Sequence, residues 1–407
     1  MKCRHCDENL DLDFLDLGTA PFSNSFLKKE DLRIAELWSP LRVSVCSNCW
    51  LVQTKEIIES ETLFTNDYVY FSGYSSTWIS HAEEYAAMLA KSCENVENKF
   101  FVEIASNDGT LISAVQKKGL RVLGIEPTES TAQVARALGI ETLNVFFGAE
   151  VGKNIRARYG AADFIAANNV LAHVPDINDF VSGIRELLDE EGTATIEFPY
   201  LMNLMNHLQF DTIYHEHFSY FSLLSVEKIL LTNGLRVFDV QEIEVHGGSL
   251  RIFVKHIKKT EGISPTVSQI REREIESGLD RASSYSNFAS KVATIKYESL
   301  DFLINSRLSG KKVAGYGAAA KGNTFINYLG VKSDLVSYIV DANPRKQGRF
   351  APGSRIPVVS EAVLLEDKPD YVVIFPWNLT KEIVNQLSYI RNWNAKFVVF
   401  IPKLIVF

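Results

Sequence analysis

The sequence has no apolar run long enough to cross a bilayer, and no apolar stretch follows its first residues. A membrane span needs roughly 20 apolar residues, and a secretory leader needs an apolar segment behind its charged start. We therefore expect a cytoplasmic protein without a membrane partner. Basic residues are in the minority, with 42 Lys and Arg against 50 Asp and Glu and a formal net charge of -8. This balance disfavours a general nucleic-acid surface.

Cysteine is scarce, with five residues among 407. Four of them form two pairs, Cys3-x-x-Cys6 and Cys46-x-x-Cys49, while Cys93 stands apart. A reducing compartment argues against disulfides, and neither pair follows a strand and opens a helix as a redox pair would. Four thiolates on two short turns are the ligand set that zinc prefers, and they leave no open coordination position. We predict a structural zinc site; two unrelated cysteine pairs are the alternative.

A chain of 407 residues is too long for one core of ordinary size. Residues 1–60 show little regular pattern beyond the paired cysteines. From residue 100, short apolar strands alternate with helices that end at glycine, which is typical of a doubly wound parallel sheet. The expected strands are 100–105, 122–125, 163–167 and 193–197, the expected helices are 110–118 and 132–138, and an antiparallel pair, 237–245 and 249–256, closes the sheet.

A second α/β pattern begins at residue 312, after an amphipathic connector over 260–309. Its expected strands are 313–316, 335–340, 371–375 and 396–401. The predicted fold class is therefore α/β, with a Rossmann-like domain, an N-terminal zinc-binding module and a second, C-terminal Rossmann-like domain. We place the three parts at 1–66, 67–258 and 259–407.

The loop after the first strand has the composition of a cofactor turn. It reads Glu-Ile-Ala-Ser-Asn-Asp-Gly over 103–109, and its small residues let a ligand approach the backbone. Glu126 ends the next strand, where a carboxylate can bind both ribose hydroxyls. A dinucleotide would need Gly-x-Gly-x-x-Gly and would be repelled by Asp108, whereas a cationic sulfonium would not. The loop therefore favours S-adenosylmethionine, with an ordinary core turn as the alternative.

Polar residues also follow the third strand, at the sheet edge where such folds bind ligands. Asn168 and Asn169 would lie near the adenine, and His173 would lie near the reacting centre unless it is only a structural histidine. The predicted cofactor-binding residues are Glu103, Ala105, Asn107, Asp108, Gly109, Glu126, Asn168 and Asn169.

The segment Tyr214-His215-Glu216-His217 carries the densest chemistry in the chain. It follows the fourth strand, so it can reach the same crevice. The two histidines would point the same way only in an extended segment. A metal site is conceivable, but the spacing differs from the helical His-Glu-x-x-His of zinc hydrolases. General acid–base chemistry fits better, because histidine and a buried glutamate titrate near neutrality.

The C-terminal part opens with Gly315-x-Gly317 and continues to Lys321 and Asn323, which suits a diphosphate cradle at a helix start. A dinucleotide site is an alternative, because Asp341 ends the next strand, and a structural turn is another. The predicted substrate-binding residues are Tyr316, Lys321, Asn323 and Arg251, the last as an anion contact.

Taken together, these motifs resemble the nucleotide-sugar C-methyltransferases, above all the S-adenosylmethionine-dependent 3-C-methyltransferases that act on keto-deoxysugars linked to a nucleoside diphosphate. The resemblance rests on both cysteine pairs, on the loop 103–109, on 214–217, on His-Gly-Gly-Ser-Leu-Arg over 246–251 and on Gly-Tyr-Gly-Ala-Ala-Ala-Lys-Gly over 315–322. The motifs occur in the family's order and span nearly the whole chain. One departure is Ala105, which replaces the first glycine of the common methyltransferase loop.

The resemblance implies a methyltransferase domain between the zinc module and a C-terminal domain that holds the nucleotide of the substrate. It implies that five residues surround the sugar and carry catalysis: Tyr68, His173, Tyr214, Glu216 and His217. We expect a monomer that methylates a dTDP-linked keto-deoxysugar at C-3, through a proton lost to His217 or Glu216 and an enolate stabilised by Tyr214 or His173. The alternatives are a nicotinamide-dependent oxidoreductase and a silent zinc-containing scaffold.

Overall fold

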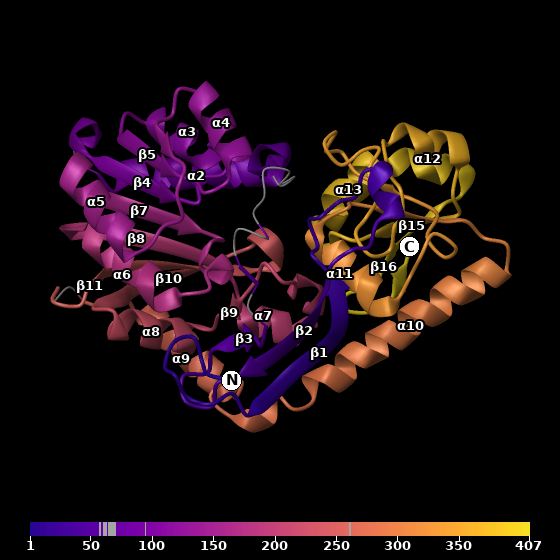
Figure 1. Cartoon of the computed structure of the whole chain (residues 1–407), viewed down its shortest axis with the longest axis horizontal. Coiled ribbons are helices and arrows are strands. Elements are labelled where there is room, and N and C mark those ends of the chain that lie inside the picture. Colours follow the sequence, from indigo (N-terminus) through magenta and orange to yellow (C-terminus); the bar gives the residue numbers. More distant parts are fainter. Residues whose placement is uncertain (57, 60–62, 64–70, 94, 260–261) are drawn as a thin grey trace.

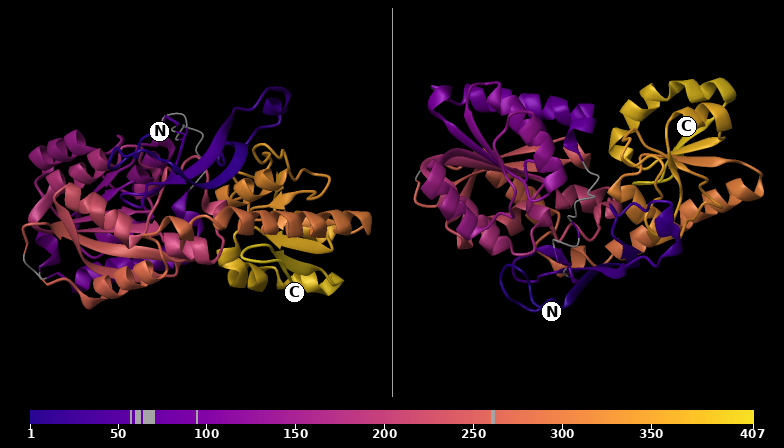
Figure 2. Two further views of the ribbon diagram at one scale, coloured as in Figure 1. Left: turned by 90° about the horizontal axis from the view of Figure 1, so that it is seen from below. Right: turned by 45° about the horizontal axis from the view of Figure 1, so that its top comes forward.

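The computed structural model describes residues 1–407 except 57, 60–62, 64–70, 94 and 260–261. Its strands form three sheets, of four, seven and six strands. The seven-stranded and six-stranded sheets lie in two separate α/β parts, and the four-stranded sheet lies beneath both of them in Figure 1 and in the right-hand view of Figure 2. The predicted fold class is confirmed. No described helix has both the length and the apolar character of a membrane span.

The four-stranded sheet is antiparallel and has the order β1-β2-β3-β9. Its strands are β1 Leu12–Pro21, β2 Trp38–Val45, β3 Val52–Thr54 and β9 Ser219–Tyr220. The sequence predicts little regular structure over 1–60, and this expectation is wrong. Register shifts between Asp13 and Leu15 and between Asp16 and Thr19 break the two-residue alternation that would have marked β1 as a strand.

The seven-stranded sheet has the order β10-β11-β8-β7-β4-β5-β6. The strands β4 to β8 are parallel, and β10 and β11 close the sheet as the predicted antiparallel pair. Its strands are β4 Phe100–Ile104, β5 Arg121–Ile125, β6 Thr142–Leu143, β7 Ala162–Asn168, β8 Leu188–Pro199, β10 Leu235–Ile243 and β11 Ser249–His256. The helices of this part are α2 Ser76–Lys91, α3 Thr110–Gln116, α4 Glu129–Ala137, α5 Ala149–Tyr159, α6 Ile177–Leu187, α7 Leu201–Asn206, α8 Leu223–Thr232 and α9 Pro265–Glu276.

The six-stranded sheet has the order β14-β13-β12-β15-β16-β17 and is parallel except for β17. Its strands are β12 Val313–Tyr316, β13 Ile339–Val340, β14 Val358–Val359, β15 Tyr371–Ile374, β16 Lys396–Val399 and β17 Ile405–Val406. The helices are α10 Phe288–Leu308, which leads into this part, α11 Ala320–Leu329, α12 Ala362–Asp367 and α13 Thr380–Gln386.

Short 3-10 helices connect these elements: η1 Glu30–Arg33, η2 Ser72–Tyr74, η3 Val96–Asn98, η4 Leu171–His173, η5 Phe210–Thr212, η6 Val245–Gly247, η7 Ala282–Ser284, η8 Trp377–Leu379 and η9 Ser388–Trp393. Two of them, η4 and η5, lead into the segments that carry the predicted catalytic residues.

The N-terminal residues contact the C-terminal part directly. Leu27 forms a two-way backbone bridge with Phe350, and the ring of Phe14 in β1 stacks on that of Phe288 in α10 at 4.5 Å between centroids. Aromatic stacking and paired backbone groups hold such contacts in place. The N-terminal residues therefore link the two α/β parts rather than forming a separate appendage.

Candidate active site

The four paired cysteines converge into one cluster. All four sulfur atoms lie within 4.8 Å of one another, and the Sγ–Sγ distances are 3.5 Å for Cys3 and Cys49 and 3.5 Å for Cys6 and Cys46. Zinc–sulfur bonds of about 2.3 Å in a tetrahedron put the sulfur atoms about 3.8 Å apart. The cluster therefore fits a zinc ion, and its four ligands leave no position for a substrate.

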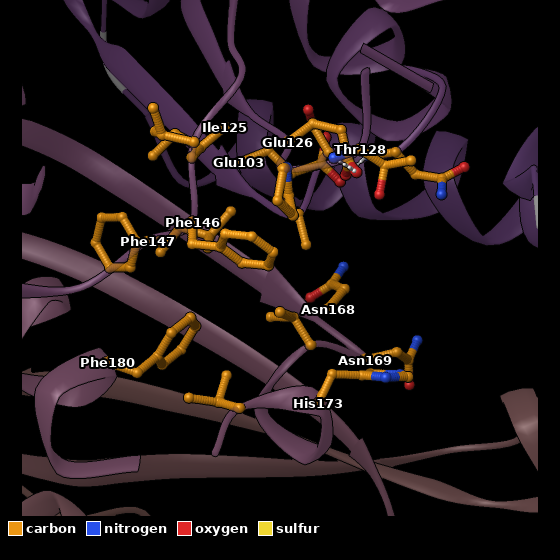
Figure 3. A pocket seen from close by; sticks show the side chains of 18 of the residues that line it. Glu103, Ile125, Glu126, Thr128, Phe146, Phe147, Asn168, Asn169, His173 and Phe180 are labelled. Carbon is orange, nitrogen blue, oxygen red and sulfur yellow. Dashed lines mark hydrogen bonds between the residues drawn. The ribbon is translucent and has the colours of Figure 1, made fainter. Parts of the chain in front are cut away.

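A cavity of about 550 Å³ opens at the carboxyl ends of β4, β5 and β7. Figure 3 shows Glu103, Glu126 and Thr128 on one side of it and Asn168, Asn169 and His173 on the other. Six of the eight predicted cofactor residues line the cavity: Glu103, Ala105, Asn107, Glu126, Asn168 and Asn169. The crevice thus lies where a doubly wound sheet is expected to bind its ligand.

Glu126 fixes the loop that forms the floor of the cavity. Its Oε2 accepts a hydrogen bond from the backbone N–H of Asn107 at 2.9 Å, and its Oε1 accepts one from that of Thr128 at 2.9 Å. Burial raises the pKa of Glu126, and these two backbone hydrogen bonds oppose the rise. Because a carboxylate has about four acceptor positions, Glu126 can still accept from ribose hydroxyls.

Two of the predicted cofactor residues, Asp108 and Gly109, are not among the residues that line the cavity. Asp108 lies behind the loop, where it accepts from the hydroxyl of Ser72 at 2.6 Å and the backbone N–H of Gly73 at 2.8 Å. Gly109 has φ +84°, and a Cβ there would lie 3.0 Å from the Cβ of Ala135. The carboxyl group that faces the cavity from β4 is Glu103, and burial raises its pKa well above the usual range.

Ala105 shows why a glycine is common at its position. Its φ is +59°, in the left-handed region that residues with a Cβ rarely adopt. Asn107 at φ +49° and Asn169 at φ +55° share this conformation, which asparagine tolerates better than most residues. All three residues line the cavity. Backbone strain of this kind gathers at ligand sites, where the surrounding structure holds it in place.

His217 and Tyr214 form a hydrogen-bonded pair. The Nδ1 of His217 lies 2.8 Å from the backbone oxygen of Thr212, and its Nε2 lies 2.8 Å from the hydroxyl of Tyr214. Because a carbonyl only accepts, Nδ1 must donate, so in the neutral ring Nε2 carries the lone pair and the tyrosine hydroxyl donates to it. The lone pair of His217, a potential base, therefore accepts a hydrogen bond from the hydroxyl of Tyr214, a potential acid.

The acid–base segment adjoins the cavity through His173. The ring centroids of His173 and His217 are 4.7 Å apart, and His173 lines the cavity. Burial lowers the pKa of His173 to about 4, partly offset by a hydrogen bond to the backbone of Glu216. His173 is therefore a neutral imidazole near pH 7. The side chain of His173 therefore contacts both the cavity and the pair formed by Tyr214 and His217.

The segment forms a turn rather than a strand, so its two histidines diverge. His215 lies 3.2 Å from the backbone oxygens of Ser39 and Pro40, on the side of β2. Glu216 is 2% exposed and accepts a hydrogen bond from the Nδ2 of Asn24 at 2.7 Å. Tyr68, which the resemblance places around the sugar, lies outside the described residues.

The three predicted substrate residues of the C-terminal part point to different neighbours. Lys321, in the first turn of α11, donates to the Oδ1 of Asn378 at 2.8 Å. Burial lowers the pKa of its ammonium group. The Nδ2 of Asn323 donates to the backbone oxygen of Ser23 at 2.7 Å, and the hydroxyl of Tyr316 accepts from Gln386 at 2.8 Å.

Three family models match successive parts of the chain. They are a "Putative zinc binding domain" over residues 3–64, a "Methyltransferase domain" over 80–240 and a "C-methyltransferase C-terminal domain" over 244–402. The C-methyltransferase NovU of Streptomyces niveus is 34% identical over 403 residues, which cover 99% of this chain and 96% of that protein. The chain belongs to the C-methyltransferase family.

Two solved methyltransferase structures are each similar to less than half of this C-methyltransferase. The magnesium protoporphyrin IX methyltransferase of Synechocystis with bound SAM has 15% identity and a TM-score of 0.33, over 43% of this chain and 77% of that chain. A SAM-dependent methyltransferase of Anabaena variabilis has 14% identity and a TM-score of 0.36, over 44% of this chain and 86% of that chain. Likenesses this weak do not bear on function.

S-adenosylmethionine is the methyl donor of this C-methyltransferase, and the cavity suits it. Both polar atoms of the Asn168 side chain and the Oδ1 of Asn169 are buried without a partner among the described residues. Buried polar groups are normally paired, so these atoms are free for the polar groups of a ligand. Glu103 and Glu126 add carboxyl groups whose oxygen atoms can accept hydrogen bonds from a ligand. The cysteine cluster is the zinc site of the family's N-terminal domain.

Aromatic residues of the cavity are absent from the sequence-based prediction. Phe146 is 43% exposed although it lines the cavity, and Trp78 and Phe180 also line it. An exposed aromatic ring at a ligand cavity suits a flat group such as adenine. Phe146 follows the two-residue strand β6, and so short a strand leaves no periodic pattern that would place it at the sheet edge.

Arg251, which the sequence predicts as an anion contact, is paired with a buried carboxylate of this chain. Its Nε donates to the Oε1 of Glu197 at 2.6 Å, and its guanidinium lies 4.9 Å from the ring centre of Tyr85. His81 also contacts Glu197, at 2.8 Å. Since Glu197 is fully buried, its charge needs this pairing, which engages Arg251 within the methyltransferase domain.

Proposed function

We propose that this C-methyltransferase methylates a nucleoside-diphosphate keto-deoxysugar, with a dTDP sugar as substrate and C-3 as the methylated carbon. The observation that carries the proposal is the acid–base pair beside the methyl-donor cavity: Tyr214 and His217, separated from that cavity by His173. A carbon next to a ketone must lose a proton before it can accept a methyl group, and such a pair can manage that proton. The sugar and the position come from the family resemblance.

His217 is the proposed base. Its Nδ1–H is fixed on the backbone of Thr212, which leaves Nε2 to take the proton from C-3. As that C–H bond breaks, its electron pair forms the enolate and the keto oxygen becomes negative. We assign Tyr214 to donate a hydrogen bond to this oxygen, because its hydroxyl hydrogen is the one aimed at the site of proton transfer. S-adenosylmethionine supplies the electrophilic methyl group when it is bound.

Glu216 is the alternative proton acceptor in this proposal. It is buried in the same turn, and its backbone contacts His173. Glu216 and His217 are neighbours in the chain, and ionisable groups that interact titrate as a pair. The protonation of His217 and the charge of Glu216 are therefore expected to be linked, and a negative Glu216 favours the protonated imidazole that forms when C-3 loses its proton.

The C-terminal part is proposed to hold the nucleotide. Lys321 would meet the diphosphate, and the backbone N–H groups at the start of α11 would add to its charge stabilisation. Placing the nucleotide there leaves the sugar free to lie over His217, between the two α/β parts. Since one chain supplies all of the described site residues, the proposed active unit is a monomer.

The decisive experiment compares His217→Asn with His215→Asn. Asparagine cannot accept the proton, so we expect His217→Asn to lower kcat about 10²–10⁴-fold on a dTDP-linked 4-keto-deoxysugar. Calorimetric affinity for S-adenosylhomocysteine should stay unchanged. His215 is the matched control, because it faces β2 and should tolerate the change with kcat nearly intact. Normal turnover by His217→Asn would remove His217 from the reaction.

A further inference from the structure

A segment of the zinc-binding part enters the acid–base site. The Nδ2 of Asn24 donates to the Oε1 of Glu216 at 2.7 Å, across 192 positions of sequence. Glu216 is 2% exposed, and Asn24 is half-buried. At this depth a carboxylate needs hydrogen-bond donors, since burial disfavours its charged form and donors restore it. Asn24 therefore donates a hydrogen bond to the side chain of Glu216, and it does so from outside the methyltransferase domain.

The segment that carries Asn24 is anchored on both sides. The backbone oxygen of Ser23 accepts from the Nδ2 of Asn323 in α11 at 2.7 Å. Phe22 packs the edge of its ring against His215 at 5.3 Å between centroids. The backbone N–H of Phe26 donates to the backbone oxygen of Asn24 at 3.0 Å. These contacts leave Asn24 little freedom, so its amide is held in place toward Glu216.

We infer that Asn24 is a positioning residue that orients the carboxylate of Glu216 in the acid–base site. The inference rests on the proposed function, because it assigns Asn24 to the same proton transfer. The amide nitrogen only donates, so it fixes one carboxylate oxygen and stabilises the ionised form. Its neighbour Ser23 bonds to α11, which the proposed function places at the substrate's diphosphate. The segment therefore connects the substrate-binding helix to the acid–base turn.

Asparagine is the residue type that this position requires. An aspartate of the same shape would place a second carboxylate about as close to Glu216 as the amide is now, and two carboxylates in contact cannot both ionise near neutrality. The other titratable groups near Glu216 include His173 across the turn and Tyr214, His215 and His217 within it. None of these is changed by a substitution at Asn24, so an altered titration would report the Asn24–Glu216 contact.

The test measures kcat against pH for Asn24→Asp, Asn24→Ala and Ser25→Asp in the full-length zinc protein. For Asn24→Asp we expect the acidic limb of the profile to move to higher pH by one unit or more. Asn24→Ala should lower kcat tenfold or more and move the limb in the same direction. KM for S-adenosylmethionine should stay unchanged in both. Ser25 is exposed, so Ser25→Asp adds the same charge one residue away without touching Glu216 and should leave the profile as in the wild type.

Solvent deuterium exchange into a dTDP-linked 4-keto-deoxysugar, with S-adenosylhomocysteine present, follows proton removal alone. Loss of this exchange in Asn24→Ala, with normal S-adenosylhomocysteine binding, supports positioning of the acid–base site. If the wild type turns over but both Asn24 variants match Ser25→Asp, the inference is overturned while the proposed function stands. If the wild type neither exchanges nor methylates this sugar, the proposed function fails first. Should Asn24→Asp not bind S-adenosylhomocysteine, Asn24→Ala decides alone.

Discussion

Asp211 is a buried carboxyl group where the methyltransferase domain meets the C-terminal part. It is 1% exposed, and its Oδ2 accepts from the indole Nε1 of Trp377 at 2.8 Å. Its Oδ1 is buried without a partner among the described residues. Burial raises the pKa of Asp211 to about 6, against the attraction of Lys321 and the hydrogen bond from Trp377. The carboxylate is therefore costly to the fold at neutral pH.

We predict that Asp211→Asn stabilises the protein at pH 7.5, since asparagine keeps an acceptor for Trp377 and carries no charge. The unfolded carboxyl has a pKa near 4, so the stability tied to the raised folded pKa is complete below pH 4 and is lost as pH rises through 6. At pH 7.5 the cost is on the order of 2–3 kcal/mol. The variant's advantage in apparent Tm should fall by about half at pH 5.

The control for this experiment is Asp334→Asn, which removes an exposed carboxylate. It should leave the difference in Tm between pH 7.5 and pH 5 as it is in the wild type. An Asp211→Asn protein that is no more stable at pH 7.5 would show that Asp211 is not destabilising as a carboxylate. Scanning fluorimetry of both variants at the two pH values makes the comparison.

At the same scale, the sequence predicts residue types better than their orientation. Tyr214 and His217 lie together because three positions of a turn separate them, which any compact local structure would keep. Asp108 and Gly109 lie in the predicted loop but face η2 and α4, because the loop has two sides and only tertiary packing decides which one meets the cavity. Asn24 lies 192 positions from Glu216, and no local pattern connects such a pair.

Among the elements, β9 joins the turn 214–217, which carries the proposed base, to the zinc-binding part. Its two residues pair with β3, and one residue separates them from the turn. The backbone oxygen of Phe218, between the turn and β9, accepts from the Nη1 of Arg4 at 2.8 Å. Arg4 lies between two of the zinc ligands, Cys3 and Cys6. Zinc is therefore expected to fix the turn through both the strand pairing and this arginine.

We predict that Cys46→Ser lowers zinc content and slows turnover at least tenfold, because a lost ligand loosens the turn of Arg4 and the pairing of β9. Amide hydrogen exchange at 219–220 should speed up together with the loss of zinc. Cys93→Ser is the matched control, since Cys93 is not in the cluster. A zinc-depleted protein with unchanged exchange at 219–220 would show that the metal does not hold the turn 214–217 in place.

Elements differ in how far a sequence predicts them. The strands β4, β5, β7 and β8 are found because buried parallel strands form continuous apolar runs. The sequence does not predict the pair of β1 and β2, because its bulges break the alternation of apolar and polar residues. It does not predict β9, because a strand of two residues is too short to show such an alternation. Elements that exist only through pairing with distant residues are the ones that sequence patterns miss.

In the whole molecule, the proposed binding sites for the two ligands lie on different sheets. The cavity proposed for the methyl donor lies over the seven-stranded sheet, while the proposed diphosphate site at Lys321 belongs to the six-stranded one. Each sheet has a cluster of buried apolar residues of its own, and a third cluster includes residues of both sheets. Damage to one binding site is therefore expected to leave the affinity of the other ligand unchanged.

We predict that two substitutions that change the shape of the side chain little will each weaken the binding of a different ligand. Glu126→Gln replaces a carboxylate oxygen that accepts a backbone N–H with an amide group that cannot, so affinity for S-adenosylhomocysteine should fall tenfold or more. Lys321→Met removes the ammonium group, so KM for the dTDP sugar should rise tenfold or more. Calorimetry with S-adenosylhomocysteine and with dTDP measures both variants.

Measuring both variants with both ligands distinguishes a loss of ligand contacts from a loss of the contact between the domains. If each variant weakens only its own ligand, the α/β parts bind independently and meet only during the reaction, where proximity contributes to kcat. Equal losses of both ligands in Lys321→Met would instead mean that Lys321 supports the contact between the domains, through its attraction to Asp211 and its contact with the ring of Trp377. Trp377 bonds Asp211, next to the Thr212 carbonyl that fixes His217, so that outcome would also slow proton exchange on the bound sugar.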